Sequence, residues 1–238
     1  PEPDTAFEVL HRGHLNVEAV VVDVHSRYPT DLPVILSGFS AGGFGAIYNF
    51  ETVVARYPRT TVVSDAGIAP GVPGSTMEME AERLAERWSA LELLPAYCRD
   101  RSCIANTLHL LAAHARAHNG RGERPWRPFG LLQGQQDSTL SAYLEVSPCG
   151  YQLALASGLA EALANDNVRA YVPATSKHVF GAVNPLEAPF RSSGGVDPIA
   201  WAAALGAAEA PDDLPPNALD PWMACNAVLL PLGHAPAP

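Results

Sequence analysis

Short apolar runs alternate with amphipathic stretches along most of this chain. Four runs have the length and composition of buried strands and are bounded by glycine, proline or polar residues; they cover residues 34–37, 60–64, 129–134 and 168–175. Apolar residues recur at helical spacing in other segments; these are 12–28, 41–55, 77–94, 104–118 and 150–164. Repeated alternation of strand and helix predicts an α/β fold, with a mostly parallel sheet and helices on both faces.

The pattern changes near residue 184, where prolines and glycines begin to interrupt it. Only residues 197–208 keep the periodicity of a helix in this part. We therefore expect a core over residues 1–183 and an irregular C-terminal extension over 184–238 that packs on the core.

The segment VILSGFSAGG, residues 34–43, places a serine between a predicted strand and a predicted helix. Gly38, Ser40 and Gly42 match G-x-S-x-G, the nucleophile elbow of α/β-hydrolases. The serine backbone is strained in that turn, and side chains two residues either side would collide with the adjacent strand and helix. The backbone N–H of Ala41, at the helix N-terminus, is predicted to stabilise an oxyanion. The alternative is a tight strand-to-helix crossing in which Ser40 only caps the helix.

A catalytic serine needs a base, and the base needs a carboxylate that fixes its tautomer. His178 comes just after the fourth predicted strand, so it should lie at the carboxyl edge of the sheet, where Ser40 also emerges. Asp137 follows the third predicted strand, which is the usual place of the acid in α/β-hydrolases. Asp65, after the second strand, is the alternative acid, or a structural group that caps the loop after it. The pattern thus predicts an α/β-hydrolase-like fold with Ser40, Asp137 and His178 as the triad.

The other histidines carry weaker signals. Three share the predicted helix 104–118 but do not follow the H-E-x-x-H pattern of zinc enzymes; they are His109, His114 and His118. We expect them on a solvated helix face, with no metal and no cofactor in the protein, although a metal-dependent hydrolase built on this helix is the alternative. His11, His14 and His25 precede the elbow and are predicted to lie on a helix surface.

The four cysteines indicate in which cellular compartment the protein resides. Cys98 and Cys103 enclose a short polar loop that a disulfide could close, which would leave Cys149 and Cys225 as a second, long-range pair. Three pairings are formally possible, and reduced buried thiols are the main alternative. The second pair is too widely spaced for a usual zinc site. Disulfides favour a secreted or periplasmic protein.

Charge and hydropathy exclude two classes of partner. The formal net charge is −10 with no basic cluster, so nucleic acid is a poor partner. The longest apolar runs fall far short of the roughly 20 residues that span a bilayer, so no membrane span is predicted. The first residues, PEPDTAFEVL, lack the features of a signal peptide; an export signal has been removed or was never there.

Four motifs resemble the pectin acetylesterase family, which also contains the animal Notum carboxylesterase. They are SGFSAGGFGAIYNFETV, VVSDAGIAP, QGQQDS and ATSKH, and the likeness runs from about His11 to His178. The resemblance implies a catalytic serine at Ser40, an aspartate followed by glycine near Asp65, a later catalytic aspartate at Asp137 and a histidine at His178. It also implies disulfides, secretion and a bacterial-type member of the family.

The chain departs from this family at two places. Ala66 stands where the family usually has serine, and the glycine-rich segment with a tryptophan that lies well before the elbow in relatives has no counterpart here. Because strands before the elbow normally pair with the elbow strand, residues 33–37 would otherwise form an exposed apolar edge. We therefore expect an N-terminal segment or another chain to complete the sheet and the oxyanion hole.

The sequence thus predicts a serine carboxylesterase, with acetyl groups on a polysaccharide such as pectin as the substrate implied by the resemblance. A lipid-ester or polyester hydrolase on the same scaffold is one alternative. A noncatalytic binding module that keeps the hydrolase scaffold is another. Trp201 and Trp222, in the extension, are candidate walls of the substrate pocket, or ordinary packing residues.

Overall fold

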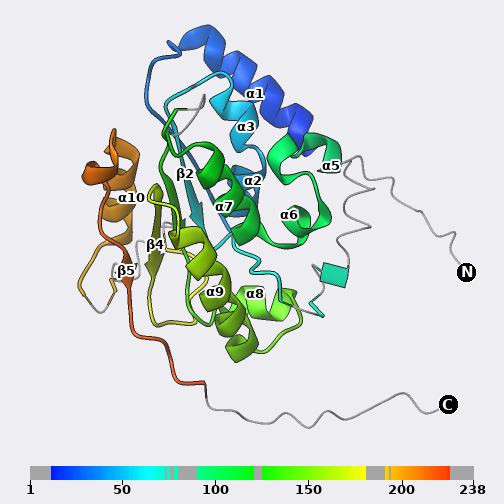
Figure 1. Cartoon of the computed structure of the whole chain (residues 1–238), viewed down its shortest axis with the longest axis vertical. Helices are drawn as coiled ribbons and strands as arrows, with labels where there is room; N and C mark the ends of the chain where they lie inside the picture. Colours follow the sequence, from blue (N-terminus) through cyan, green and yellow to red (C-terminus); the bar gives the residue numbers. More distant parts are fainter. Residues whose placement is uncertain are drawn as a thin grey trace, which may run out of the picture.

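The computed structural model describes residues 12–72, 74–75, 78–79, 90–120, 125–180, 191–192 and 194–225. Their centre is a five-stranded, all-parallel sheet in the order β1-β2-β3-β4-β5 (Figure 1). The strands are β1 (Val34–Phe39), β2 (Thr60–Asp65), β3 (Phe129–Leu132), β4 (Val168–Val172) and β5 (Ala218–Leu219). The predicted α/β class with a parallel sheet is confirmed.

Helices cover both faces of this sheet (Figure 1). One face packs against α2 (Ala41–Tyr48), α3 (Phe50–Val54), α7 (Thr107–Ala117) and α9 (Pro148–Leu163), which share the larger hydrophobic core. The other face packs against α10 (Pro198–Ala207), which contributes Trp201 and Leu205 to a second, smaller core. The central strands β2, β3 and β4 are therefore shielded from water on both sides, as is typical of parallel sheets.

Shorter elements complete the described chain. The helix α1 (Gly13–Arg27) packs on α3, and α8 (Ser138–Tyr143) follows β3. Between β2 and α7 lie α5 (Ala90–Leu93), the 3₁₀ turn η1 (Ala96–Cys98) and α6 (Arg101–Ala105). A second 3₁₀ turn, η2 (Pro211–Asp213), precedes β5. Most of the predicted helix 77–94 and His11 lie outside the described residues.

Two predicted helices are interrupted by asparagine. The segment 41–55 forms α2 and α3 with a break at Asn49, whose side chain donates a hydrogen bond to the carbonyl of Gly45. The segment 104–118 forms α6 and α7 with a break at Asn106, whose side chain caps α7 by accepting from His109 N. Asparagine favours such local bonds to the backbone, which compete with a continuous helix.

The C-terminal part is more regular than the sequence indicates. The expected helix 197–208 is α10, but the prediction of an otherwise irregular segment missed β5, which pairs with β4 and extends the sheet. A two-residue strand has no periodicity that a sequence pattern could show. The division of the chain at residue 183 stays a prediction.

The strand β1 lies at one edge of the described sheet, where it pairs only with β2. Its side chains alternate in exposure, and Ile35 and Phe39 are about half exposed, at 48% and 49%. An apolar edge of this kind agrees with the expectation from residues 33–37. Its completion by a further segment or chain stays a prediction.

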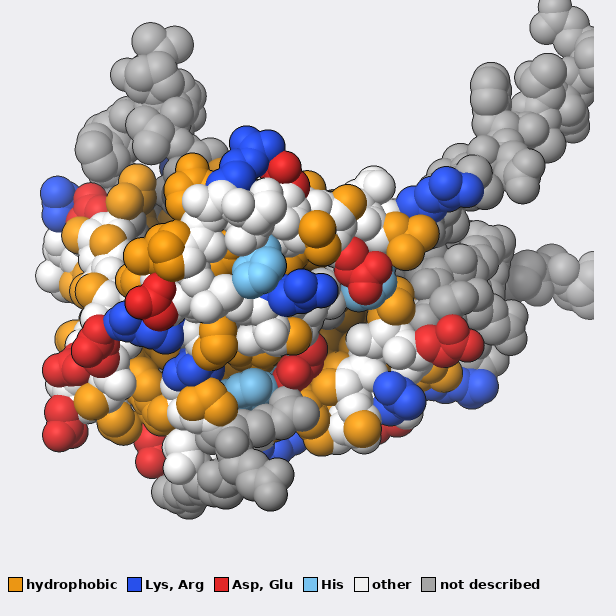
Figure 2. All heavy atoms as spheres, turned by 90° about the horizontal axis from the view of Figure 1, so that it is seen from above, with side chains coloured by type: hydrophobic (Ala, Val, Ile, Leu, Met, Phe, Trp, Pro, Cys, Tyr) orange, Lys and Arg blue, Asp and Glu red, His pale blue; other side chains and the backbone are white. Residues whose placement is uncertain are grey.

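The surface and the helices bear on possible partners. On the face shown in Figure 2, lysine and arginine side chains are scattered among acidic and hydrophobic ones. Among the described residues, no helix combines the length and the apolar character that crossing a bilayer demands.

Candidate active site

Ser40 occupies the turn between β1 and α2. Its backbone has φ 52° and ψ −120°, a left-handed conformation that is costly for a residue with a side chain. Three bonds hold it there, because Ser40 N donates to Asp65 O at 2.8 Å while Gly43 N and Phe44 N donate to Ser40 O. The strained serine that the elbow motif predicts is present.

Close backbone approaches explain some of the surrounding glycines but not all. A side chain at Gly38 would overlap the backbone of Gly42, so this glycine is required as expected. The expectation for Gly42 itself is wrong, because a Cβ there meets open space. The second tight contact lies one residue later, where Gly43 of α2 rests directly on Gly67 in the loop after β2.

Asp137 is fully buried at the N-terminus of α8. Its Oδ1 accepts hydrogen bonds from Thr139 N and Leu140 N, which caps the helix. Its Oδ2 accepts from Gln133 Nε2 and lies 2.8 Å from the Nδ1 of His178. Buried polar groups need hydrogen-bond partners, and this set holds Asp137 in one orientation.

His178 is thereby joined to Asp137 as the sequence predicts. Its side chain is 18% exposed, and the bond at Nδ1 leaves Nε2 as the nitrogen available to another group. The loop that carries His178 is fixed to the loop after β3, because Gln136 N donates to Thr175 O and Ser138 N donates to Ser176 O.

Asp65 lies at the end of β2 and is 3% exposed. Both of its carboxylate oxygens accept from the backbone N–H of Phe180, two residues after His178. Its own carbonyl holds Ser40 N. Asp65 thus ties the histidine loop to the serine turn, a structural role different from the capping of the following loop that the sequence suggested, and the carboxylate bonded to His178 is that of Asp137.

The serine and the histidine are not joined by a hydrogen bond. Ser40 Oγ makes no hydrogen bond within the described part of the chain, whereas His178 is bonded through Nδ1. Both residues lie beyond the carboxyl ends of parallel strands, and Asp65 contacts both segments. Catalytic hydrogen bonds are often long in ligand-free structures and tighten when substrate binds.

Ala41 is the first residue of α2 and is exposed. Its N–H belongs to the first helical turn, where backbone donors have no partner inside the helix. No described residue accepts a hydrogen bond from it. The N–H of Ala41 is therefore free to bind an anionic oxygen next to Ser40.

A cavity of about 540 Å³ adjoins Ser40 and Ala41. It lies among α1, α2, α5 and α8, and most of the surface that lines it is apolar. The lining side chains include Phe44, Tyr48, Leu93, Leu94, Ile104 and Leu140. Sequence reasoning did not find this cavity, because its walls come from segments that are distant along the chain and look like ordinary core positions.

The two tryptophans do not line this cavity. Trp201 is 3% exposed in the smaller core under α10, and its indole N–H donates to Pro216 O. Trp222 is 46% exposed beyond β5. The suggestion that they form walls of the pocket is wrong for this cavity, and for Trp201 the reason is that α10 covers the opposite face of the sheet from α2.

The histidines of α7 are mostly buried, which corrects the expectation of a solvated face. His114 and His118 are 1% and 3% exposed and pack edge-on against Phe50. His118 Nε2 lies 2.8 Å from a carboxylate oxygen of Glu51. Burial of such polar rings is tolerated because they have partners. His14 is partly buried beside the cavity, whereas His25 is exposed as expected.

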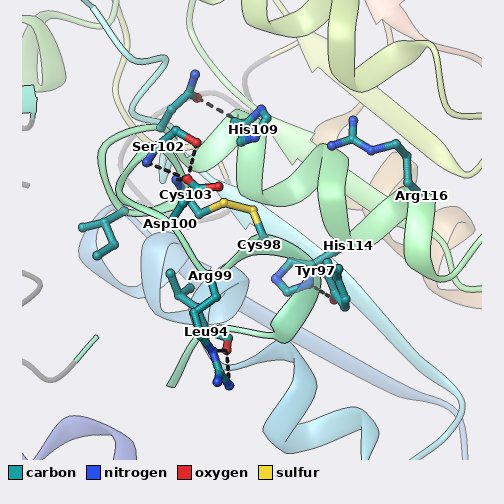
Figure 3. Close-up of a disulfide and its surroundings, with 12 residues drawn as sticks. Leu94, Tyr97, Cys98, Arg99, Asp100, Ser102, Cys103, His109, His114 and Arg116 are labelled. Carbon is teal, nitrogen blue, oxygen red and sulfur yellow. Dashed lines mark hydrogen bonds between the residues drawn. A yellow bond between two sulfur atoms is a disulfide. The ribbon is translucent and has the colours of Figure 1, made fainter. Parts of the chain in front are cut away.

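Both expected disulfides are present. Cys98–Cys103 joins η1 to α6, with Cα atoms 6.0 Å apart, and Cys149–Cys225 ties the end of the described chain to α9 (Figure 3 shows the first). His109 lies within 4.8 Å of both sulfurs of the first pair, but those sulfurs are bonded to one another and offer no thiolate. Among the described residues this is the one cluster with metal-ligand composition.

Charge and burial near the site also act on Tyr151. Its ring lies in the core, and its hydroxyl donates to Ile68 O. Burial, and secondly the negative charge of Asp137, raise the pKa of Tyr151 well above its usual value. Tyr151 is therefore a structural donor, and it is unsuited to act as a base.

Comparison with protein-family models, with curated proteins and with solved structures finds no significant match to this chain. The resemblance to pectin acetylesterases consequently remains one of motifs. What the chain does must be inferred from the geometry of its own residues.

Proposed function

We propose that the chain is a serine carboxylesterase. The observation that carries the proposal lies at the carboxyl ends of the parallel strands. Ser40 has a strained backbone there, and the buried Asp137 holds His178 by a bond of 2.8 Å at the same end of the sheet. A strained serine and an oriented imidazole, each built from a different strand end, are the parts that hydrolysis through an acyl-enzyme needs. Asp65 supports the proposal by linking the two loops.

In this mechanism, Ser40 Oγ attacks the ester carbonyl and its proton passes to His178 Nε2. The carbonyl oxygen becomes an oxyanion beside the N–H of Ala41. The C–O bond to the alcohol then breaks, and His178 returns the proton to the departing alcohol oxygen. Water, deprotonated by His178, then attacks the acyl-enzyme, the bond between Ser40 Oγ and the acyl carbon breaks, and His178 returns the proton to Ser40 Oγ as the acid leaves. Asp137 stabilises the imidazolium formed in each step.

The polysaccharide substrate that the motifs imply remains a prediction. So does secretion, which the two disulfides favour because such bonds persist mainly in oxidising compartments. Membership of the pectin acetylesterase family, which the motifs suggest, also remains a prediction.

Fluorophosphonate labelling tests the proposal directly. The probe should modify the wild-type protein on the peptide that contains Ser40, and Ser40→Ala should abolish both labelling and ester hydrolysis, by a factor on the order of 10⁴ to 10⁶ in rate. Circular dichroism should show the same fold for both proteins. Ser37→Ala, at an exposed position of β1, is the matched control and should label normally.

Two results would contradict the proposal. Absence of labelling in a folded protein would favour the noncatalytic binding module. Activity that survives Ser40→Ala but is lost with a chelator would favour the metal-dependent hydrolase instead.

A further inference from the structure

The cavity beside Ser40 is much larger than an acetyl group requires. Its volume of about 540 Å³ lies within the range of about 300–1,000 Å³ that holds drug-sized molecules. An acetyl group extends only one methyl beyond the carbonyl carbon that Ser40 attacks. A substrate with an acetyl group would therefore leave most of this space unfilled.

The walls are unsuited to a hydroxyl-rich sugar, because several of their polar atoms already have partners. The hydroxyl of Tyr48 donates to Ile104 O at 2.6 Å. The side chain of Asn49 donates to Gly45 O, and its oxygen lies 3.2 Å from His14 Nδ1. Thr139 and Tyr143, which carry hydroxyls, also line the cavity, but most of its wall is apolar, so sugar hydroxyls placed there would lose most of their hydrogen bonds to water without replacement. An apolar group loses nothing there and gains from leaving water.

The position of His178 indicates which side of the ester the cavity holds. His178 must reach the oxygen of the departing alcohol, so the alcohol lies on the histidine side of Ser40. His178 does not line the cavity, whose walls include α2, α5 and α8. The group that extends into the cavity is therefore the acyl chain, which remains attached to Ser40 in the acyl-enzyme.

We propose that this cavity is an acyl-binding pocket and that the preferred substrates are esters of medium-chain or similarly bulky apolar acids rather than acetyl esters. The inference rests on the proposed function, since it assumes that Ser40 is acylated. It replaces the acetyl specificity implied by the motifs with one based on the shape and polarity of the site.

The α5 wall of the pocket is held in place by contacts behind it. The guanidinium of Arg99 donates twice to the carbonyl of Leu94, and the neighbouring Cys98 is tied to Cys103 (Figure 3). Asp100 then caps α6 through its carboxylate. A pocket with an anchored wall is expected to discriminate by chain length more sharply than a loose one.

The first test is a series of p-nitrophenyl esters with acyl chains from acetate to dodecanoate, assayed on the full chain. Transfer of one methylene from water to an apolar site favours binding by about fourfold. We expect kcat/KM to rise by about that factor for each added methylene up to hexanoate or octanoate, and then to level off or fall. A profile that is flat, or highest for acetate, would overturn the inference.

The second test fills the pocket. Gly45 borders the cavity, and a Cβ built on it meets no atom within 4 Å, so Gly45→Leu should place its side chain there without disturbing α2. We expect this variant to lose at least tenfold in kcat/KM on octanoate while acetate changes less than threefold. Ala160→Leu, at an exposed position of α9, is the matched control and should leave the profile unchanged.

A second variant covers the case in which Gly45→Leu does not fold. Leu93 lines the cavity and is 42% exposed, so Leu93→Asp should fold and should penalise long acyl chains more than acetate. Equal losses on all esters in the folded variants would contradict an acyl pocket. Fluorophosphonate labelling separates the two proposals: labelling of Ser40 with a preference for acetate defeats only this inference, whereas no labelling defeats the esterase itself.

Discussion

At the scale of single residues, Ser40 is one of three non-glycine residues of the described chain with a positive φ, and the other two are Ala66 and Glu145. The positive φ of Ser40 costs of the order of 1–3 kcal/mol and persists because three hydrogen bonds and the Gly38–Gly42 contact impose it. Strain of this kind aims a side chain away from both the strand and the helix. A serine that only capped α2 would not need it, and Ser40 makes no side-chain capping bond.

The two buried aspartates should respond differently to the loss of charge. In Asp137→Asn the amide can no longer hold His178 in the required tautomer, and we expect kcat to fall by a factor on the order of 10⁴. Asp65→Asn keeps an oxygen that accepts from Phe180 N, so we expect less than a tenfold loss. Steady-state kinetics on one good ester substrate compares them, and the reverse order would assign the acid to Asp65.

Residue type and position along the chain predicted the pair of Asp137 and His178, since each follows a predicted strand in the expected order. Neither type nor spacing could show that Gln133 also binds Asp137, or that Asp65 fixes Phe180. The Gln133 contact lies within the turn after β3, whereas the contact between Asp65 and Phe180 joins loops that are 115 residues apart. The second contact depends on where the parallel strands place their ends.

At the scale of elements, two glycines allow α2 to pack closely against the end of β2. The contact between Gly43 and Gly67 brings the helix backbone against the loop after β2, close to the hydroxyl of Ser64. The helix could not reach this position if either residue carried a side chain. The orientation of the first turn of α2, and hence of the Ala41 N–H, depends on this contact.

Two alanine substitutions should therefore have opposite effects on stability. Gly67→Ala would overlap the Gly43 backbone and should lower the free energy of unfolding by about 1–3 kcal/mol. Gly42→Ala meets open space within α2 and should raise it by up to about 1 kcal/mol, because alanine favours a helix. Urea unfolding of both variants measures the difference. A stable Gly67→Ala would show that the close contact is not required.

The break between α6 and α7 shows why helical periodicity predicted one helix where there are two. Thr107 N donates to Ala69 O, and Asn106 forms an isolated bridge with Pro70. The loop after β2 thus takes up backbone groups that a continuous helix would use. A pattern of apolar residues reports which side faces the core, but it contains no information about such a bond.

At the scale of the whole molecule, the segment after β5 is bonded to the loop that carries Asp137. Gln135, two residues before Asp137, donates to Asp220 O and Pro221 O and accepts from Met223 N. Gln152 of α9 donates to Met223 O, and the Cys149–Cys225 disulfide lies next to these bonds. The C-terminal part of the described chain therefore supports the loop that holds Asp137.

The two disulfides should differ in their contribution to stability. Cys149 and Cys225 are 76 residues apart, and Cys98 and Cys103 only 5. The loss of chain entropy in the unfolded state then stabilises the fold by about 4.5 kcal/mol for Cys149–Cys225 and by about 2 kcal/mol for Cys98–Cys103. We expect the Cys149→Ala/Cys225→Ala protein to unfold at clearly lower urea concentration than Cys98→Ala/Cys103→Ala. Equal midpoints would mean that the long loop is constrained by other contacts in the unfolded state.

By itself the sequence determined the alternation of strands and helices, the turn around Ser40 and the places of Asp137 and His178 just after predicted strands, because these depend on neighbours a few residues away. Only the tertiary structure decided that Asp65 binds Phe180 N, that the loop after β2 takes up backbone groups at the break between α6 and α7, that Trp201 packs on the opposite face of the sheet from α2, and that an apolar cavity adjoins Ser40. These features arise from contacts between segments that are distant along the chain. The residues of one segment do not show which distant residues will pack against it, so a local pattern cannot predict these contacts.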